Sequence, residues 1–138
     1  MPKSDLQEIT LKVIRGKKLP LIAASHEDKN NPGVFKQVLL DSFSIPGGKV
    51  QMLNWATLPK GSSFKAHYHE RMHEIFIIVS GSALMTVNKA EFKLETKDLI
   101  LVPARSTHKM KNTADIDCQY IVFGILSGKG GKTINVSN

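Results

Sequence analysis

Hydrophobic residues in this chain occur in short runs that alternate with polar residues or are continuously apolar. Almost no segment places its apolar residues at the spacing of a helix. The predicted strands are residues 9–14, 34–40, 50–58, 64–69, 74–80, 83–87, 91–94, 99–102, 108–111, 119–125 and 133–136. Turn-forming pairs such as Gly81-Ser82 and Asn88-Lys89 separate several of these runs. Many short strands at this spacing predict an all-β fold, either a sandwich or a barrel.

The length and composition of the chain fit one globular domain. It has 138 residues, 41% of them hydrophobic, and no apolar run is long enough to span a bilayer. No signal-peptide pattern follows the first residues, so we expect a cytoplasmic protein with no membrane partner. Cys118 is the only cysteine, which excludes an internal disulfide. Any metal site must therefore use histidine and carboxylate ligands.

The formal net charge of +7 raises the question of nucleic-acid binding. The 19 lysine and arginine residues are scattered, and no basic run is interleaved with aromatic residues. This distribution is typical of a solvated surface, so we expect no nucleic-acid partner. The positive charge could still favour an anionic small molecule as ligand.

Ligand-type side chains gather in residues 61–81, GSSFKAHYHERMHEIFIIVSG. His67 and His69 are two apart, so on a strand they share a face. Glu74 would face away on an uninterrupted strand, so we expect residues 70–73 to form a turn that brings a second strand beside the first. Two imidazoles and a carboxylate on one interior face would need a partner, which a divalent cation can supply. The alternative is an ordinary surface hairpin, because His-x-His also arises by chance.

Two motifs with fixed spacing stand out in the chain. The first is carried by Gly61, His67, His69, Glu74 and Gly81, and the second by Pro103, His108 and Asn112. Together they resemble the two motifs of the cupin family. Lys97 and Arg105 stand where glycine is usual, and we expect them to loosen the surrounding turns. The resemblance covers residues 50–125 and implies a cupin-type double-stranded β-helix, or jelly-roll barrel. It also implies that His67, His69, Glu74 and His108 coordinate one divalent transition metal, for which iron, manganese, nickel and zinc are all suitable.

These observations predict a layout for the whole chain. We expect a single domain, 1–138, with N-terminal strands and a loop in 1–48, the barrel core in 49–125, and a tail with a short strand in 126–138. Phe76, Ile78 and Met110 share faces with the metal-ligand candidates, so they are predicted to line a small, mostly apolar pocket. His73 is expected at the rim of the site and His26 in a loop, and Lys65 shares the inward parity of the histidines.

The predicted strand 74–80 is apolar on both faces. Its outward row of Ile75, Ile77 and Val79 needs a cover, which predicts a homodimer. Two function classes fit the chain as a whole. One is a metal-dependent enzyme of the dioxygenase or isomerase type that acts on a small polar or carboxylate-bearing molecule. The other is a non-catalytic, metal-containing module that binds a small ligand, and no residue beyond the metal ligands identifies a catalytic group.

Overall fold

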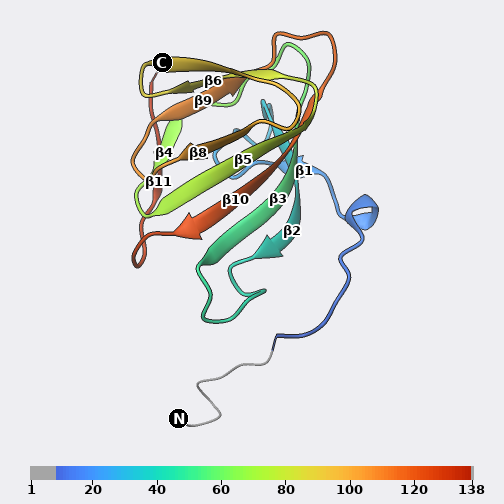
Figure 1. Ribbon diagram of the computed structural model, residues 1–138, viewed down its shortest axis with the longest axis vertical. Coiled ribbons are helices and arrows are strands. Elements are labelled where there is room, and N and C mark those ends of the chain that lie inside the picture. The colour runs from blue at the N-terminus through green and yellow to red at the C-terminus, as the bar shows by residue number, and fades with distance from the viewer. Residues whose placement is uncertain (1–8, 138) are drawn as a thin grey trace.

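A computed structural model of the protein describes residues 9–137, which consist mainly of β-strands and their connections (Figure 1). One short 3-10 helix, Gly16–Lys18, occurs in this part of the chain. The strands are β1 (Ile22–Ala23), β2 (Phe35–Asp41), β3 (Val50–Leu58), β4 (His67–His69), β5 (Met72–Ser80), β6 (Ala83–Val87), β7 (Ala90–Leu94), β8 (Leu99–Val102), β9 (His108–Lys111), β10 (Cys118–Leu126) and β11 (Thr133–Asn135). The predicted all-β fold is confirmed.

The strands form two antiparallel sheets. The six-stranded sheet has the order β1-β2-β3-β10-β5-β8, and the five-stranded sheet has the order β11-β4-β9-β6-β7. Strands that follow one another in sequence often lie in different sheets, as β4 and β5 do, because the chain crosses between the layers. This two-sheet arrangement is that of a jelly roll.

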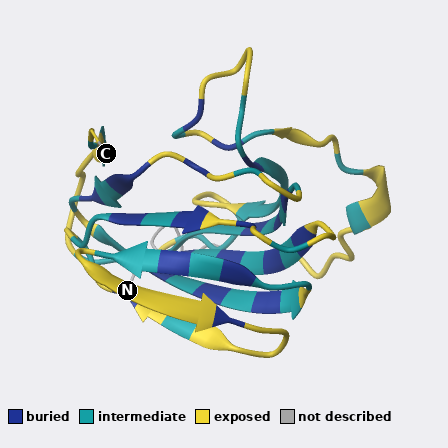
Figure 2. Cartoon of the chain, turned by 90° about the horizontal axis from the view of Figure 1, so that it is seen from above, coloured by how far each residue is buried: buried dark blue, intermediate teal, exposed yellow. Residues whose placement is uncertain are grey.

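The core lies between the sheets and follows from the period-two alternation of the strands. On β5, Glu74, Phe76 and Ile78 are buried while their neighbours are partly exposed, and β10 repeats the pattern. Figure 2 shows this alternation of buried and half-buried residues along the central strands. Because successive side chains point to opposite faces, one face of each strand fills the interior.

The predicted strand at residues 9–14 is wrong. This segment has no regular secondary structure, and Ile9, Leu11 and Val13 are 62%, 97% and 68% exposed. Among the described residues, no strand pairs with it, so its backbone has no ladder of hydrogen bonds to join.

The helices of residues 9–137 include none long and apolar enough to cross a membrane.

The two turns that carry Lys97 and Arg105 keep a glycine-like conformation. Their φ angles are 79° and 70°, in the left-handed region that favours glycine. A side chain there costs on the order of 1 kcal/mol. Hydrogen bonds hold both turns, since Lys97 N–H donates to Ile78 O (2.8 Å) and Arg105 N–H donates to His69 O (2.7 Å). The expected loosening is not seen.

Candidate metal centre

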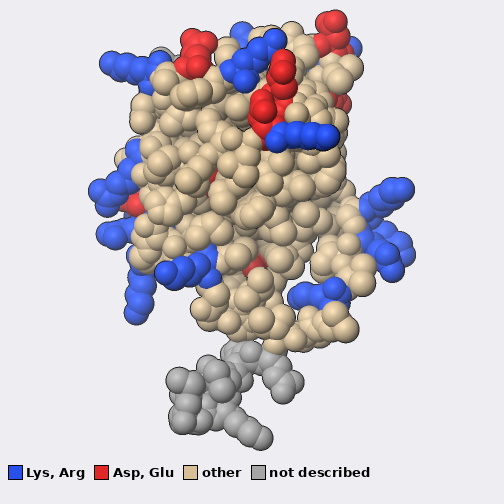
Figure 3. Space-filling view, viewed as in Figure 1, with Lys and Arg blue, Asp and Glu red and all other residues tan. Residues whose placement is uncertain are grey.

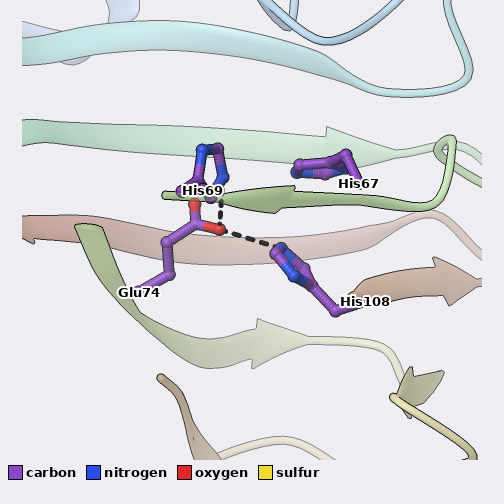
Figure 4. A group of neighbouring side chains, drawn as sticks. All are labelled: His67, His69, Glu74 and His108. Atoms are coloured by element: carbon purple, nitrogen blue, oxygen red, sulfur yellow. Dashed lines mark ion pairs between the residues drawn. The ribbon is translucent and has the colours of Figure 1, made fainter. Parts of the chain in front are cut away.

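Three strands carry the four predicted metal-ligand residues to one place inside the barrel. His67 and His69 are the first and last residues of β4, Glu74 is the third residue of β5, and His108 opens β9. His67 lies opposite His108 in the β4–β9 pair. All four residues are at least nine-tenths buried, and Figure 4 shows their side chains turned toward one another.

Glu74 reaches this group from the opposite sheet. The turn after β4 contains only residues 70 and 71, and β5 then pairs with β10 and β8. The expectation that the turn would bring β5 beside β4 is therefore wrong. Glu74 faces the histidines across the barrel interior, which places a carboxylate and imidazoles on opposing walls.

Hydrogen bonds to the ring Nδ1 atoms fix how the histidines are presented. His67 Nδ1 lies 2.7 Å from Lys65 O and His108 Nδ1 lies 2.9 Å from Ser106 O. A carbonyl oxygen can only accept a hydrogen bond, so the Nδ1 atoms of His67 and His108 both carry a hydrogen. When these rings are neutral, each Nε2 atom therefore has a free lone pair. His69 Nδ1 contacts Thr133 Oγ1 at 2.8 Å. The bonds turn the Nε2 atoms of His67 and His108 into available ligands.

The Nε2 atoms of His69 and His108 converge on the carboxylate of Glu74 (Figure 4). Glu74 Oε1 is 2.8 Å from His69 Nε2 and 2.9 Å from His108 Nε2. These separations are of hydrogen-bond length, yet all three atoms are buried without a hydrogen-bond partner. If His108 is neutral and its proton is on Nδ1, the lone pair of its Nε2 atom faces the Glu74 carboxylate oxygen. Two electron-rich atoms at this distance repel each other. A shared cation, either a proton or a metal ion, is needed to make this arrangement favourable.

The environment of the cluster favours the ligand forms of its side chains. Burial, together with the nearby His26 and His108, lowers the pKa of His67 to about 3 and keeps its imidazole neutral at pH 7. Burial raises the pKa of Glu74, but hydrogen bonds in which its carboxylate shares a proton with the imidazoles of His108 and His69 outweigh it and hold that pKa well below its usual range. A neutral imidazole and an ionised carboxylate are the forms that bind metals.

The donor set fits a divalent transition metal. One donor atom from each of the four residues lies within 4.8 Å of the others. Nitrogen and oxygen donors of this kind suit iron, manganese, nickel or zinc. The buried cluster could therefore hold a metal ion, and a cation would supply the partner that three of its atoms lack.

A cavity of about 130 Å³ adjoins the cluster, and His67, His69 and Glu74 form part of its wall. Of the three residues predicted to line a pocket, Phe76 borders this cavity. Ile78 and Met110 are fully buried in the core cluster and do not border it. The wall also includes polar residues that the sequence prediction did not include: Ser25, His26, Lys36, Asn54, Tyr120 and Thr133.

The loop before β2 comes closer to the cluster than the sequence indicated. The His26 ring stacks on that of His67, with centroids 3.9 Å apart, and its Nδ1 lies 2.8 Å from Glu27 Oε2. The buried Glu27 carboxylate also accepts hydrogen bonds from Gly33 N–H and Lys65 N–H. These bonds tie the loop to the barrel and place His26 at the cavity.

Three other residues singled out in the sequence lie outside the cavity wall. His73 Nδ1 accepts a hydrogen bond from Ala104 N–H at 2.8 Å. Lys65 has an exposed side chain. Its backbone N–H donates to Glu27 Oε2, and its carbonyl oxygen accepts from His67 Nδ1. Cys118 is fully buried, and burial raises the pKa of its thiol to about 11, so it is an inert core residue.

Comparison with known proteins agrees with this architecture. An uncharacterized protein of Methanocaldococcus jannaschii is 33% identical over 73 residues, which cover 53% of this chain and 58% of that protein. A predicted oxalate decarboxylase of Thermotoga maritima superposes with a TM-score of 0.74 at 24% identity, covering 83% of this chain and 99% of the other. The polyketide cyclase RemF of Streptomyces resistomycificus also gives 0.74, at 16% identity, covering 94% and 87% of the two chains. Residues 54–124 match the family described as the cupin domain, and the chain belongs to that family.

Proposed function

We propose that this protein is a metal-dependent cupin enzyme of the dioxygenase or isomerase type that acts on a small polar or carboxylate-bearing molecule. The observation that carries the proposal is the set of three buried, unpartnered donor atoms, His69 Nε2, Glu74 Oε1 and His108 Nε2, which converge beside a cavity. His67 completes the proposed ligand set.

The residues of the chain have distinct parts in this proposal. Three neutral imidazoles and one carboxylate leave a divalent ion with a net positive charge, and an octahedral ion would keep two positions for other ligands. The carbonyls of Lys65 and Ser106 orient the rings of His67 and His108. When bound, the metal would polarise a substrate oxygen as a Lewis acid, and iron(II) would add oxidative chemistry.

The cavity narrows the class of substrate. Its volume of about 130 Å³ is small beside the roughly 300 Å³ at which pockets for drug-sized ligands begin. Apolar residues such as Val34, Phe64 and Val122 form much of its wall. Such a site favours a compact molecule that reaches the metal through an oxygen atom.

A non-catalytic metal-containing binding module is the second candidate. It is favoured because two titratable residues of the cavity wall outside the cluster already have bonds within the protein: His26 to Glu27 and Lys36 to Ser25. The related structures named above carry the names of two different activities, a decarboxylase and a cyclase, and at 24% and 16% identity they support the fold alone.

One experiment distinguishes the two candidates. The native metal is identified, and small dicarbonyls, catechols, thiols and sugar acids are then tested on the metal-loaded protein, with oxygen uptake, product formation and thermal shift recorded together. The enzyme proposal predicts turnover of at least one compound and its loss in Glu74→Gln. Binding of several compounds without product under any metal would support the binding module instead.

A further inference from the structure

The cavity has a second polar region, formed by Lys36 on β2 and Asn54 on β3. Both residues border the same cavity as His67, His69 and Glu74. Neither belongs to the four-residue cluster, so the proposed metal gives them no role. An inference about this region rests on the proposed function, since it concerns what the same cavity binds.

The register of the sheet turns the Lys36 side chain inward. Lys36 lies opposite Ala56 on β3, and Ala56 lies opposite Tyr120 on β10. Ala56 and Tyr120 are buried in the core, and opposed residues of neighbouring strands share a face. The next residue, Gln37, points the other way, and its Nε2 donates to the backbone oxygens of Gly16 and Leu19.

Lys36 has a neutral hydrogen-bond partner but no counter-ion. Its Nζ donates to Ser25 Oγ at 2.7 Å, and no carboxylate of residues 9–137 forms an ion pair with it. Burial lowers the pKa of Lys36 from its ordinary value. Lys36 is half-buried and its bond to Ser25 is exposed, so the ammonium keeps part of its hydration. An anion in the cavity would give it a stronger, charge-assisted hydrogen bond.

Asn54 carries an acceptor with nothing to accept. The residue is 4% exposed, and its Oδ1 is buried without a hydrogen-bond partner. Its Nδ2 lies 3.3 Å from Met52 Sδ, a weak acceptor. A buried polar atom of this kind normally has a hydrogen-bond partner. Asn54 Oδ1 could therefore accept a hydrogen bond from a hydroxyl group of a ligand in the cavity.

We propose that Lys36 and Asn54 form a specificity subsite for a compact hydroxydicarboxylate. One carboxylate of the ligand reaches the metal cluster, the second binds Lys36 Nζ, and the hydroxyl donates to Asn54 Oδ1. The charge of the ligand complements Lys36, and its hydroxyl supplies the donor that Asn54 lacks. The small volume of the cavity limits the ligand to a short carbon chain.

Three four-carbon acids test the subsite: malate, succinate, which lacks the hydroxyl, and 3-hydroxybutyrate, which has a methyl group in place of one carboxylate. Their affinities are measured by calorimetry on the zinc-loaded protein, because zinc is redox-inactive. We expect wild type to bind malate more tightly than either analogue. Lys36→Met should weaken malate about 10- to 100-fold, as for the loss of a charged hydrogen bond. Asn54→Leu should weaken malate and leave succinate unchanged.

Lys93→Met is the matched control, because Lys93 lies on β7 with an exposed side chain. It should bind all three acids as wild type does. Circular dichroism and zinc content are recorded for every variant, and Lys36→Gln replaces Lys36→Met if the latter does not fold. Two results would overturn the subsite while zinc is fully bound: wild type does not bind malate, or the folded Lys36 variant binds malate as tightly as wild type. Neither result would count against the metal centre.

If the wild-type protein takes up no zinc, the proposed metal function fails separately. Malate is then added to the metal-free protein while the side-chain amide resonance of Asn54 is followed by NMR. A shift that Lys36→Met abolishes would support the subsite. The absence of a shift in wild type, or an equal shift in the variant, would overturn it.

Discussion

Replacement of Glu74 by glutamine should remove most of the stabilisation that a bound metal gives to this fold. Glu74 is the only carboxylate of the cluster, and its Oε1 lies within 2.9 Å of two imidazole nitrogens. Glutamine keeps the size of the side chain but removes its charge. Its amide can also donate a hydrogen bond to an Nε2 lone pair, which stabilises the metal-free protein instead.

The expected magnitude follows from ligand linkage. At a metal concentration of a hundred times the dissociation constant, binding stabilises the folded protein by about 2.7 kcal/mol. For a chain of this length that raises the melting temperature by roughly 10 °C. Loss of an outer hydrogen bond to a ligand already weakens metal binding about 10- to 100-fold, so loss of the carboxylate should cost at least ~100-fold. The same metal concentration would then stabilise Glu74→Gln by only about 0.4 kcal/mol, or roughly 2 °C.

The assay is thermal unfolding with and without the metal that the protein retains on purification. Glu91→Gln is the matched control, because Glu91 is an exposed residue of β7 and should keep the full shift. A metal-induced shift in Glu74→Gln equal to that of wild type would refute the reasoning.

Two further predictions concern the loop and the assembly. Burial raises the pKa of Glu27, but hydrogen bonds from His26, Lys65 N–H and Gly33 N–H outweigh it and lower the pKa to about 2 from 4.5. The resulting stability is complete above pH 4.5 and is lost toward pH 2, so Glu27→Gln should be less stable at pH 7 by at most about 3 kcal/mol. Urea unfolding should show this deficit shrinking at low pH, and an equal deficit at pH 7 and pH 2.5 would contradict it. Sedimentation at micromolar concentration should give a dimer, and a mass of 15.3 kDa would contradict that prediction.

The dimer prediction rests on the outer face of the six-stranded sheet. Ile75 pairs with Leu101 and Ile77 pairs with Leu99, so these apolar side chains share one outward face. Leu99 and Leu101 are 57% and 58% exposed. Figure 3 shows a wide area with almost no charged atoms in the middle of the face it presents, with lysine and arginine mainly toward the rim. An apolar surface of this kind is typical of a contact between copies.

Local sequence patterns predicted most of the strands well, because each strand depends on alternation along a single segment. The four-residue cluster draws on β4, β5 and β9, and it was implied by the resemblance to the cupin motifs and not by alternation. The spacing of His67 and His69 correctly placed both on one face of β4. The partner of a strand depends on contacts between distant segments, and the pairing of β5 with β10 was therefore missed. At residues 9–14 the opposite happened: the sequence alternates as a strand would, but among the described residues no neighbouring strand pairs with this segment, so no strand forms.

The polar wall of the cavity was missed for different reasons. Asn54 left a readable signal, because it lies two residues from Met52 and Ala56 on an otherwise apolar inward row. Lys36 left no such signal, because the residues of β2 do not alternate between buried and exposed. His26 is placed by bonds between Glu27 and Lys65, which are 38 residues apart, and no local pattern records such a contact.

Metal analysis of the purified protein tests the central claim most directly. Elemental analysis by mass spectrometry should find about one transition-metal ion per chain in wild type, and His67→Ala and His108→Ala should each lose most of it because each deletes a proposed ligand. Circular dichroism of the same samples confirms that the variants remain folded. Wild-type protein that holds no metal after exposure to iron, manganese, nickel and zinc, or folded variants with the same metal content as wild type, would contradict the account.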